Sequence, residues 1–127
     1  MESYVKSTVQ ADRIIIEFFH PAGNSLPATL LTQLVTQINA ANKEKPNVIL
    51  LKSAGDRTFC AGASFDELMS IKDEKEGLLF FSGFANVINA IRKSNKIVLT
   101  RVQGKAVGGG VGLIAASDHV IATRFAS

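Results

Sequence analysis

Two short segments of small residues could carry chemistry in this chain through their backbone. One covers residues 58–64 (TFCAGAS) and the other covers residues 104–110 (GKAVGGG). Each follows an apolar segment typical of a strand and precedes a helical pattern, so each should lie where a strand leads into a helix. Residues with little or no side chain at such a place let a ligand approach the backbone closely.

The chemistry suited to such helix starts is the stabilisation of a negatively charged oxygen. The first N–H groups of a helix have no partner within the helix, and the helix dipole adds partial positive charge there. Two helix starts directed at one point would form an oxyanion site without any side chain. One such donor lowers a reaction barrier by about 3–4 kcal/mol. Most glycine-rich turns do no chemistry, however, so a purely structural role stays open on spacing alone.

The second segment runs into a weak match to the dinucleotide-binding fingerprint. Residues 110–115 (GVGLIA) fit the pattern G-x-G-x-x-A. The fingerprint should follow its strand directly and should have an acidic residue about 20 positions later. Here residues 103–109 intervene, and the given sequence ends before that acidic position. A nucleotide-binding α/β domain is therefore the weakest of the alternatives.

Five other residues are candidates for acid–base or nucleophilic roles. Asp66 and Glu67 fall in the first turn of a predicted helix, where acidic groups stabilise the dipole, which favours capping over catalysis. Asp118 and His119 are neighbours on a predicted strand and so point to opposite faces. Cys60 has no histidine near it in sequence, which favours a small packed residue over a nucleophile. No spacing of His, Cys, Asp and Glu suggests a metal site.

The elements that would position these segments alternate between strands and helices. The apolar patterns and turn residues predict strands at 4–10, 14–19, 48–51, 97–102 and 119–122, and helices starting near Pro27 and Phe65 and covering 74–93 and 111–116. The first two strands should form a hairpin. The long helix should turn one apolar stripe to the core, made of Phe80, Phe81, Phe84, Val87, Ile88 and Ile91. This order predicts an α/β fold with parallel pairing, in a single domain over residues 1–127.

Composition excludes several classes of protein. The net charge of +3, from 14 basic and 11 acidic residues, suits an anionic ligand, but the basic residues are not clustered as in a nucleic-acid-binding protein. A single cysteine allows no internal disulfide, which favours a reducing compartment. No apolar run reaches the roughly 18 residues of a membrane span, and the N-terminus lacks a signal peptide. We expect a soluble cytoplasmic protein without a membrane or nucleic-acid partner.

The two small-residue segments resemble the two signatures of the crotonase (enoyl-CoA hydratase/isomerase) superfamily. Residues 59–64 (FCAGAS) resemble its F-x-A-G-A-D loop, and residues 102–118 resemble the second signature, which ends in three glycines, a short helix and an aspartate. Residues 24–26 (NSL) are similar to the family's N-A-L. The resemblance covers nearly the whole chain, and the two signatures together are specific.

The resemblance implies a spiral of ββα units that assembles as a homotrimer or as a hexamer of two trimers. It implies that the backbone N–H groups of Ala61 and Gly109 form the oxyanion hole for the carbonyl of an acyl-CoA thioester. The substrate would be bound by the small residues at both helix starts, namely Ala61, Gly62, Ala63, Ser64, Gly108 and Gly109. The CoA is part of the substrate, so no separate cofactor is expected. The implied activities are hydration or isomerisation of an enoyl-CoA through an enolate, as in fatty acid metabolism.

Two departures from the family pattern concern binding. Ser64 replaces the usual aspartate, but both are good N-cap residues, so the helix start should be preserved. Gly23 and Asn24 stand where many members carry a basic residue that meets a CoA phosphate. Lys52 and Lys105 are the candidates to replace that residue.

A third departure concerns catalysis. Hydratases of the family use two glutamates, and the first of these positions is Gly112 here, which cannot transfer a proton. The second position would follow Ser127, as would the family's C-terminal helices. We therefore expect the chain to be the N-terminal portion of a single crotonase-like domain, truncated before those helices. A catalytically inactive CoA-binding or scaffold module is the alternative to an enzyme.

Overall fold

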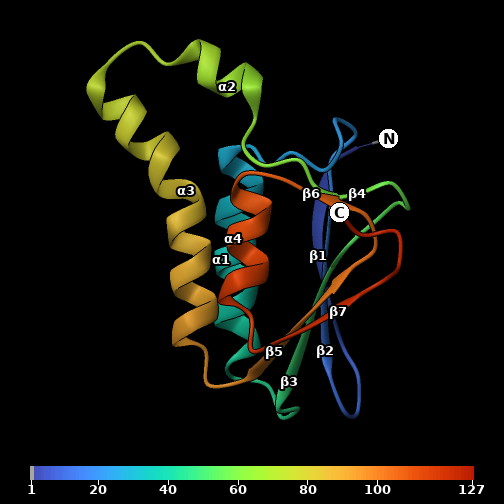
Figure 1. Ribbon diagram of the computed structural model, residues 1–127. Helices are drawn as coiled ribbons and strands as arrows, with labels where there is room; N and C mark the ends of the chain where they lie inside the picture. Colours follow the sequence, from blue (N-terminus) through green and yellow to red (C-terminus); the bar gives the residue numbers. More distant parts are fainter. Residues whose placement is uncertain (1) are drawn as a thin grey trace.

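The computed structural model describes residues 2–127, which form seven strands and four helices. The strands are β1 (Tyr4–Val9), β2 (Ile14–Phe19), β3 (Val48–Ser53), β4 (Thr58–Cys60), β5 (Ile97–Val102), β6 (Lys105–Ala106) and β7 (His119–Ala122). The helices are α1 (Ala28–Ala41), α2 (Phe65–Ser70), α3 (Glu74–Lys93) and α4 (Gly109–Ala116). Figure 1 shows α1, α3 and α4 as one layer beside the strands, with α2 projecting away from that layer.

Five strands form one mixed sheet in the order β1-β2-β3-β5-β7. Strands β1 and β2 are antiparallel, which confirms the predicted hairpin, and the remaining pairs are parallel. Strands β4 and β6 form a separate two-stranded parallel sheet. The predicted α/β class with parallel pairing is therefore confirmed.

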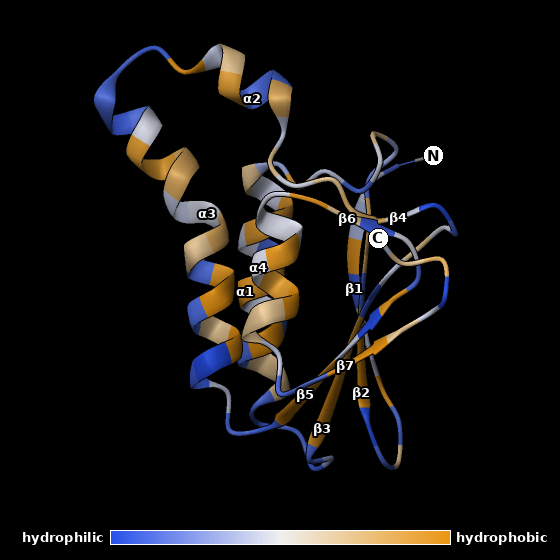
Figure 2. Cartoon of the chain, viewed as in Figure 1, coloured by the Kyte–Doolittle hydropathy of each residue, from blue (hydrophilic) through white to orange (hydrophobic). Residues whose placement is uncertain are grey.

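The core lies between the five-stranded sheet and the helices. In β2, Ile14, Ile16 and Phe18 are fully buried while the residues between them are half-buried, as the two-residue repeat of a strand requires. Helix α1 contributes a stripe at helical spacing, made of Leu30, Leu31, Leu34, Ile38 and Ala41. Figure 2 shows the matching hydrophobic colour along β2 and β3. Burying one such aliphatic side chain contributes about 1.5–3 kcal/mol.

The predicted element boundaries agree with the structure to within two residues, and two of the differences have local reasons. Helix α3 and strands β5 and β7 have the predicted bounds. Pro27 is the extended residue before α1 and not its first helical residue. Helix α4 begins at Gly109 and not at Val111, because Gly108, with φ of +55°, turns the chain sharply and lets the Gly110 N–H donate to the Val107 carbonyl at 3.0 Å.

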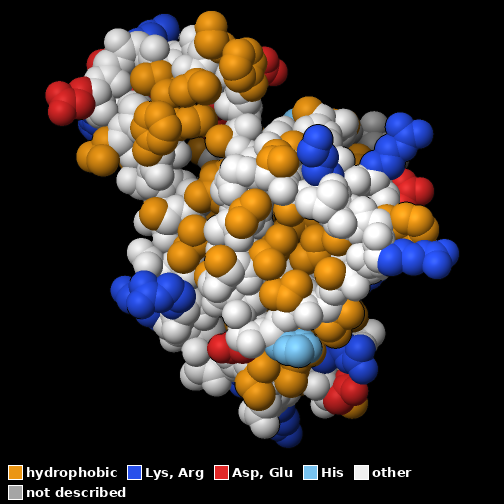
Figure 3. All heavy atoms as spheres, viewed as in Figure 1, with side chains coloured by type: hydrophobic (Ala, Val, Ile, Leu, Met, Phe, Trp, Pro, Cys, Tyr) orange, Lys and Arg blue, Asp and Glu red, His pale blue; other side chains and the backbone are white. Residues whose placement is uncertain are grey.

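The predicted apolar stripe of α3 is buried only in its second half. Val87 and Ile91 are buried, and Phe84 and Ile88 pack against the core. Phe81, by contrast, is 71% exposed, so its predicted core position is wrong. The reason is that the first half of α3 extends beyond α1, together with α2 (Figure 1). Figure 3 shows hydrophobic side chains gathered there. The exposed large hydrophobic residues of α2 and the first half of α3 are Phe65, Leu68, Met69, Leu78, Leu79 and Phe81.

Within residues 2–127, the helices are all too short or too polar to cross a lipid bilayer.

Candidate functional site

The two small-residue segments lie side by side in the structure. Strand β4 lies within the first segment and β6 lies within the second, and these strands pair in parallel, with Cys60 opposite Ala106. Just beyond the pair, the Val107 N–H donates to the Cys60 carbonyl at 3.1 Å. Because parallel strands end at the same edge of a sheet, the two segments continue toward α2 and α4 from neighbouring positions.

Three glycines, Gly62, Gly108 and Gly109, meet where the two segments approach each other. A Cβ built on Gly62 would lie 3.2 Å from the Val107 carbonyl oxygen and 3.6 Å from the Gly109 nitrogen. Gly62 and Gly108 also have positive φ angles of +91° and +55°, which side-chain-bearing residues rarely adopt. Glycine is therefore required here both for backbone conformation and for the contact between the segments.

The start of α4 leaves a backbone donor free. Gly109 is the first helical residue, and among residues 2–127 no acceptor takes its N–H within hydrogen-bond distance. Its N-cap, Gly108, has no side chain to cap the helix. The unpaired N–H and the positive end of the dipole therefore point to an anion or a polarised carbonyl as the fitting ligand.

In the first segment, the free donor is not the predicted one. The Ala61 N–H donates to the Gly23 carbonyl at 3.1 Å, and the Gly62 N–H lies 3.4 Å from Cys60 Sγ. In the part of the chain that the structure describes, the N–H of Ala63 has no such acceptor. This accounting of hydrogen bonds argues against Ala61 as a donor to a ligand and favours Ala63.

The start of α2 is capped as expected, although its glutamate has another partner. Ser64 Oγ accepts from the Glu67 N–H at 3.3 Å, which confirms the predicted N-cap. In a capping box the glutamate would bond back to the N-cap N–H. Here the Glu67 carboxylate instead accepts from the Ala28 N–H, at 2.9 and 3.1 Å, at the start of α1. The predicted capping role thus takes a different form: Glu67 caps the start of α1 and ties α2 to α1, while Ser64 caps α2.

Three further candidates for acid–base or nucleophilic roles are Cys60, Asp118 and His119. Cys60 is buried, and this burial raises the pKa of its thiol to about 11, although the Gly62 N–H acts in the opposite direction. The thiol is therefore protonated at neutral pH. The Asp118 carboxylate accepts from the Val98 N–H at 2.7 Å, while His119 is exposed at the next position. Residues 2–127 contain no group of three or more His, Cys, Asp and Glu side chains that could hold a metal.

Position 112, where the family resemblance puts a glutamate, faces a hydrophobic side chain. A Cβ built on Gly112 would lie 2.9 Å from Cδ1 of Ile88 in α3. Gly110 and Gly112 are both within α4, so the G-x-G-x-x-A match lies inside a helix and not in a turn between strand and helix. The geometry required of a dinucleotide fingerprint is therefore absent.

The two lysines considered for the CoA phosphate differ in their surroundings. Lys52 Nζ lies 3.4 Å from Glu17 Oε1, so Lys52 is engaged in an ion pair on the sheet. Lys105 is exposed on β6, within the second small-residue segment and paired with the first. Of the two lysines, Lys105 is the one without an ion-pair partner among the described residues.

Two buried polar residues near the two segments carry only a weak signal in the sequence. Asn24 and Gln103 are polar side chains that are only 4% and 5% exposed. Both donate hydrogen bonds to the carbonyl of Thr58, at 2.8 and 3.3 Å. Asn24 falls in the segment similar to N-A-L, and Gln103 directly precedes the second segment. The sequence around these two residues does not predict that their side-chain amides are buried.

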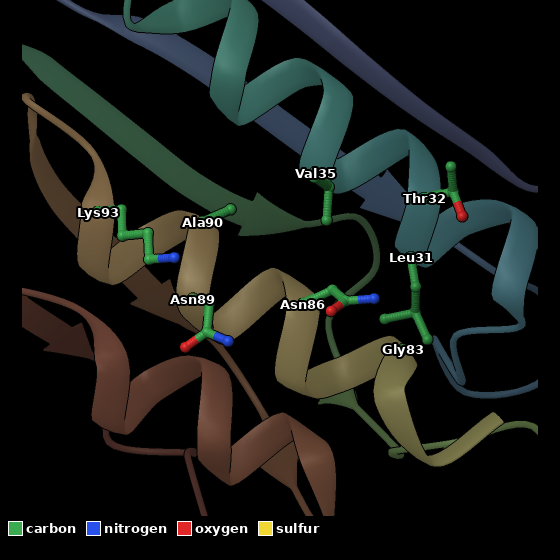
Figure 4. A pocket seen from close by; sticks show the side chains of 8 residues that line it. All are labelled: Leu31, Thr32, Val35, Gly83, Asn86, Asn89, Ala90 and Lys93. Carbon is green, nitrogen blue, oxygen red and sulfur yellow. The ribbon is translucent and has the colours of Figure 1, made fainter. Parts of the chain in front are cut away.

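A separate groove lies between α1 and α3. Figure 4 shows its lining, and its volume is about 370 Å³. The lining residues are Leu31, Thr32, Val35, Gly83, Asn86, Asn89, Ala90 and Lys93. None of them belongs to the two small-residue segments, so this groove is not part of the site.

Known proteins share both the sequence pattern and the fold. The ethylmalonyl-CoA decarboxylase of Xenopus tropicalis is 26% identical over 101 residues, which cover 80% of this chain and 34% of that protein. The mitochondrial 3-hydroxyisobutyryl-CoA hydrolase of Mus musculus is 29% identical over 105 residues, covering 80% of this chain and 27% of that protein. The crystal structure of an enoyl-CoA hydratase from Bacillus halodurans has a TM-score of 0.88 and 29% identity, covering 98% of this chain and 51% of the other.

The chain thus spans between about a quarter and a third of the length of these curated relatives and about half of the solved hydratase. The structural match confirms the predicted crotonase-like fold. The family model described as enoyl-CoA hydratase/isomerase matches residues 9–127, which is nearly the whole chain. The chain belongs to the enoyl-CoA hydratase/isomerase family.

Proposed function

We propose that this chain binds an acyl-CoA thioester and stabilises negative charge on its carbonyl oxygen, as part of an enzyme of the enoyl-CoA hydratase/isomerase type. The observation that carries the proposal is the contact between the two small-residue segments. Gly62 packs against Gly108 and Gly109, with a built Cβ 3.6 Å from the Gly109 nitrogen. This contact brings the start of α4 beside the loop that leads to α2, and an oxyanion hole requires two backbone donors close together.

The proposed donors are the N–H groups of Gly109 and Ala63. Gly109 keeps the role expected from the sequence. Ala63 takes the place of Ala61, because the Ala61 N–H already donates to the Gly23 carbonyl. Gly62 and Gly108 would let the thioester approach the backbone, and Ser64 would hold the start of α2 beside the CoA. Lys105 is the proposed partner of a CoA phosphate.

The names of the relatives support a thioester more strongly than any one reaction. One is a decarboxylase, one a hydrolase and one a hydratase, and each is named for an acyl-CoA. An oxyanion hole would serve all three reactions, since each builds up negative charge on the thioester oxygen. We favour hydration or isomerisation of an enoyl-CoA through an enolate, following the family model. We also propose that the working form is a homotrimer or hexamer, which light scattering would test.

A CoA-binding module without catalysis is the second candidate. It is favoured by Gly112, which offers no carboxylate and whose built Cβ lies 2.9 Å from Ile88. Incubation with crotonyl-CoA of a chain that also carries the family's C-terminal helices separates the two candidates. Loss of the conjugated double bond supports the enzyme, whereas binding without turnover supports the module.

The thioester itself is tested with a matched pair of ligands. Butyryl-CoA carries the carbonyl, and S-butyl-CoA is the thioether that lacks it. Titration calorimetry should show roughly tenfold tighter binding of butyryl-CoA, which is what about one net hydrogen bond contributes. Equal affinity for the two ligands would contradict an oxyanion site.

A further inference from the structure

Two buried side-chain amides connect the segments that surround the proposed donors. The first is Asn24, whose Nδ2 donates to the carbonyls of Ala54 at 2.9 Å and Thr58 at 2.8 Å. Its Oδ1 accepts from the His20 N–H at 2.8 Å. Both amide hydrogens and the amide oxygen are thus used, and the turn after β2 is held against Ala54, just after β3, and Thr58, at the start of β4.

The backbone at Asn24 has a conformation that the side chain must hold in place. Among residues 2–127, Asn24 is the one non-glycine residue with positive φ, at +56°. Asparagine tolerates this conformation better than most residues, although it still costs free energy. The preceding residue is Gly23, whose carbonyl accepts from the Ala61 N–H at 3.1 Å. The contacts of Asn24 therefore place Gly23, and Gly23 places the chain that leads to Ala63.

The second amide is Gln103, directly before the second small-residue segment. Its Nε2 lies 3.0 Å from Ser53 Oγ, 3.1 Å from the Gly55 carbonyl and 3.3 Å from the Thr58 carbonyl. Its Oε1 is buried and has no hydrogen-bond partner among the described residues. A flipped amide would put Oε1 against these same oxygens, so the contacts of Nε2 fix the orientation of the side chain.

The next residue shows how closely the two chains are held together. A Cβ built on Gly104 would lie 2.3 Å from the Arg57 carbonyl oxygen, and the Lys105 N–H donates to that oxygen at 3.1 Å. The carbonyl of Thr58, one residue further, is the common acceptor of Asn24 and Gln103. Two amides from distant parts of the sequence thus converge on one carbonyl at the start of β4.

We propose that Asn24 and Gln103 are positioning residues that set the relative placement of the two backbone donors. Asn24 acts through Gly23 and Ala61 on the first segment, and Gln103 acts on the second, with the Thr58 carbonyl as the link. Neither side chain needs to touch the substrate. This inference rests on the proposed function, because it concerns the donors assigned there.

Two substitutions remove these contacts with little other change. Asn24→Gly deletes the side-chain hydrogen bonds, while glycine adopts the positive φ without strain. Gln103→Met keeps a similar length and volume but donates no hydrogen bond. Ser94→Ala is the matched control, since it removes the hydrogen bond of Ser94 to Asn42 Oδ1 at the far end of α3.

The readout is the preference for butyryl-CoA over S-butyl-CoA, which a general loss of stability does not change. We expect the preference of about tenfold to fall below about threefold in either variant, because a displaced donor loses most of its hydrogen bond. The carbonyl stretching frequency of bound butyryl-CoA should move toward its value in water. The double variant should lose little more than either single one, because the two amides act through one network. Ser94→Ala should keep the full preference.

A measurement without ligand provides the second test. In ¹H–¹⁵N spectra, Asn24→Gly should shift the amide resonance of Gly109 as well as that of Ala63, and Gln103→Met should do the same. Folded variants that keep the thioester preference and leave both resonances in place would overturn the positioning role. The proposed function is judged on the unsubstituted chain alone. If that chain shows no thioester preference, the proposed function fails. If it shows the preference and the variants keep it, only the positioning role of Asn24 and Gln103 fails.

Discussion

The ring of Phe84 in α3 lies directly against the backbone of Gly109 at the start of α4. A Cβ built on Gly109 would come within 2.4 Å of the ring carbon Cδ1 of Phe84. No ordinary contact is that short, so any side chain at position 109 would force the ring or the helix start to move. Packing in the core thus fixes where the proposed donor lies, and residue 109 is glycine for reasons of space.

Gly109→Ala should therefore displace the start of α4. We expect a loss of about 1–3 kcal/mol in the free energy of unfolding, as for other overpacked sites. We also expect a reduced preference for butyryl-CoA over S-butyl-CoA. Urea denaturation and calorimetric titration measure the two effects. Phe84→Ala in the same chain makes room for the new methyl group, so the double variant should be more stable than the two single losses predict. Strictly additive losses would show that the ring and residue 109 do not compete for space.

Two glycines in α3 provide a matched pair. A Cβ on Gly77 would have only Ile71 Cγ2 nearby, at 3.7 Å, whereas a Cβ on Gly83 would lie 2.7 Å from Cδ1 of Leu31 in α1. Gly77→Ala should raise the free energy of unfolding by about 0.5–1 kcal/mol, because alanine is the better helix former. Gly83→Ala gains the same but must push the Leu31 methyl group aside, so its unfolding free energy should rise by less than that of Gly77→Ala. Equal effects at both sites would contradict close packing of α1 and α3.

Glu67 should hold α2 in place, since this helix has no buried residues of its own. Glu67→Ala removes the acceptor of the Ala28 N–H and should cost about 1 kcal/mol, as for the loss of a helix cap. Hydrogen exchange should become faster in the amides of α2. Glu67→Gln keeps one acceptor oxygen and serves as the control. Unchanged exchange in Glu67→Ala would mean that Ser64 alone anchors the helix.

The buried thiol of Cys60 predicts a dependence of stability on alkaline pH. Burial raises its pKa from 9.0 to about 11 in the folded chain. Folding therefore favours the protonated thiol, so this contribution to stability is complete below pH 9 and is lost as the pH rises toward 11. Cys60→Ala removes the titrating thiol. The difference in unfolding free energy between the unsubstituted chain and this variant should therefore shrink as the pH rises from 9 toward 11. Iodoacetamide should react slowly with the folded chain at pH 8, and rapid alkylation would contradict a buried thiol.

Helices and strands with a regular pattern of apolar residues could be predicted from the sequence, whereas very short strands could not. Helix α3 and strands β5 and β7 were predictable because a repeat of apolar residues extends over each of them. Strands β4 and β6 have three and two residues, which is too short for any repeat. They form because Cys60 and Ala106 meet across a long sequence separation, and only tertiary structure brings them together.

The site could be predicted as two segments but not as a set of donors. Small residues before helices show where a backbone can be approached, and both segments do lie together. Whether a given N–H is free depends on acceptors elsewhere in the chain. The Ala61 N–H is engaged by Gly23, nearly 40 positions earlier, and nothing in the pattern around Ala61 indicates this contact. The exposure of Phe81 has a similar cause, because helical spacing gives a face but not the length of the neighbouring helix.

Donors that belong to the main chain have a consequence for evolutionary change. A substitution at Ala63 would alter what lies beyond Cβ and still leave the N–H in place, whereas proline would remove it. We therefore expect selection to preserve the backbone path through Gly62, Gly108 and Gly109 more strictly than any reactive side chain near it. Acids and bases could then be exchanged between lineages, and one inherited backbone shape would continue to hold the substrate oxygen while the reaction performed on it diverged.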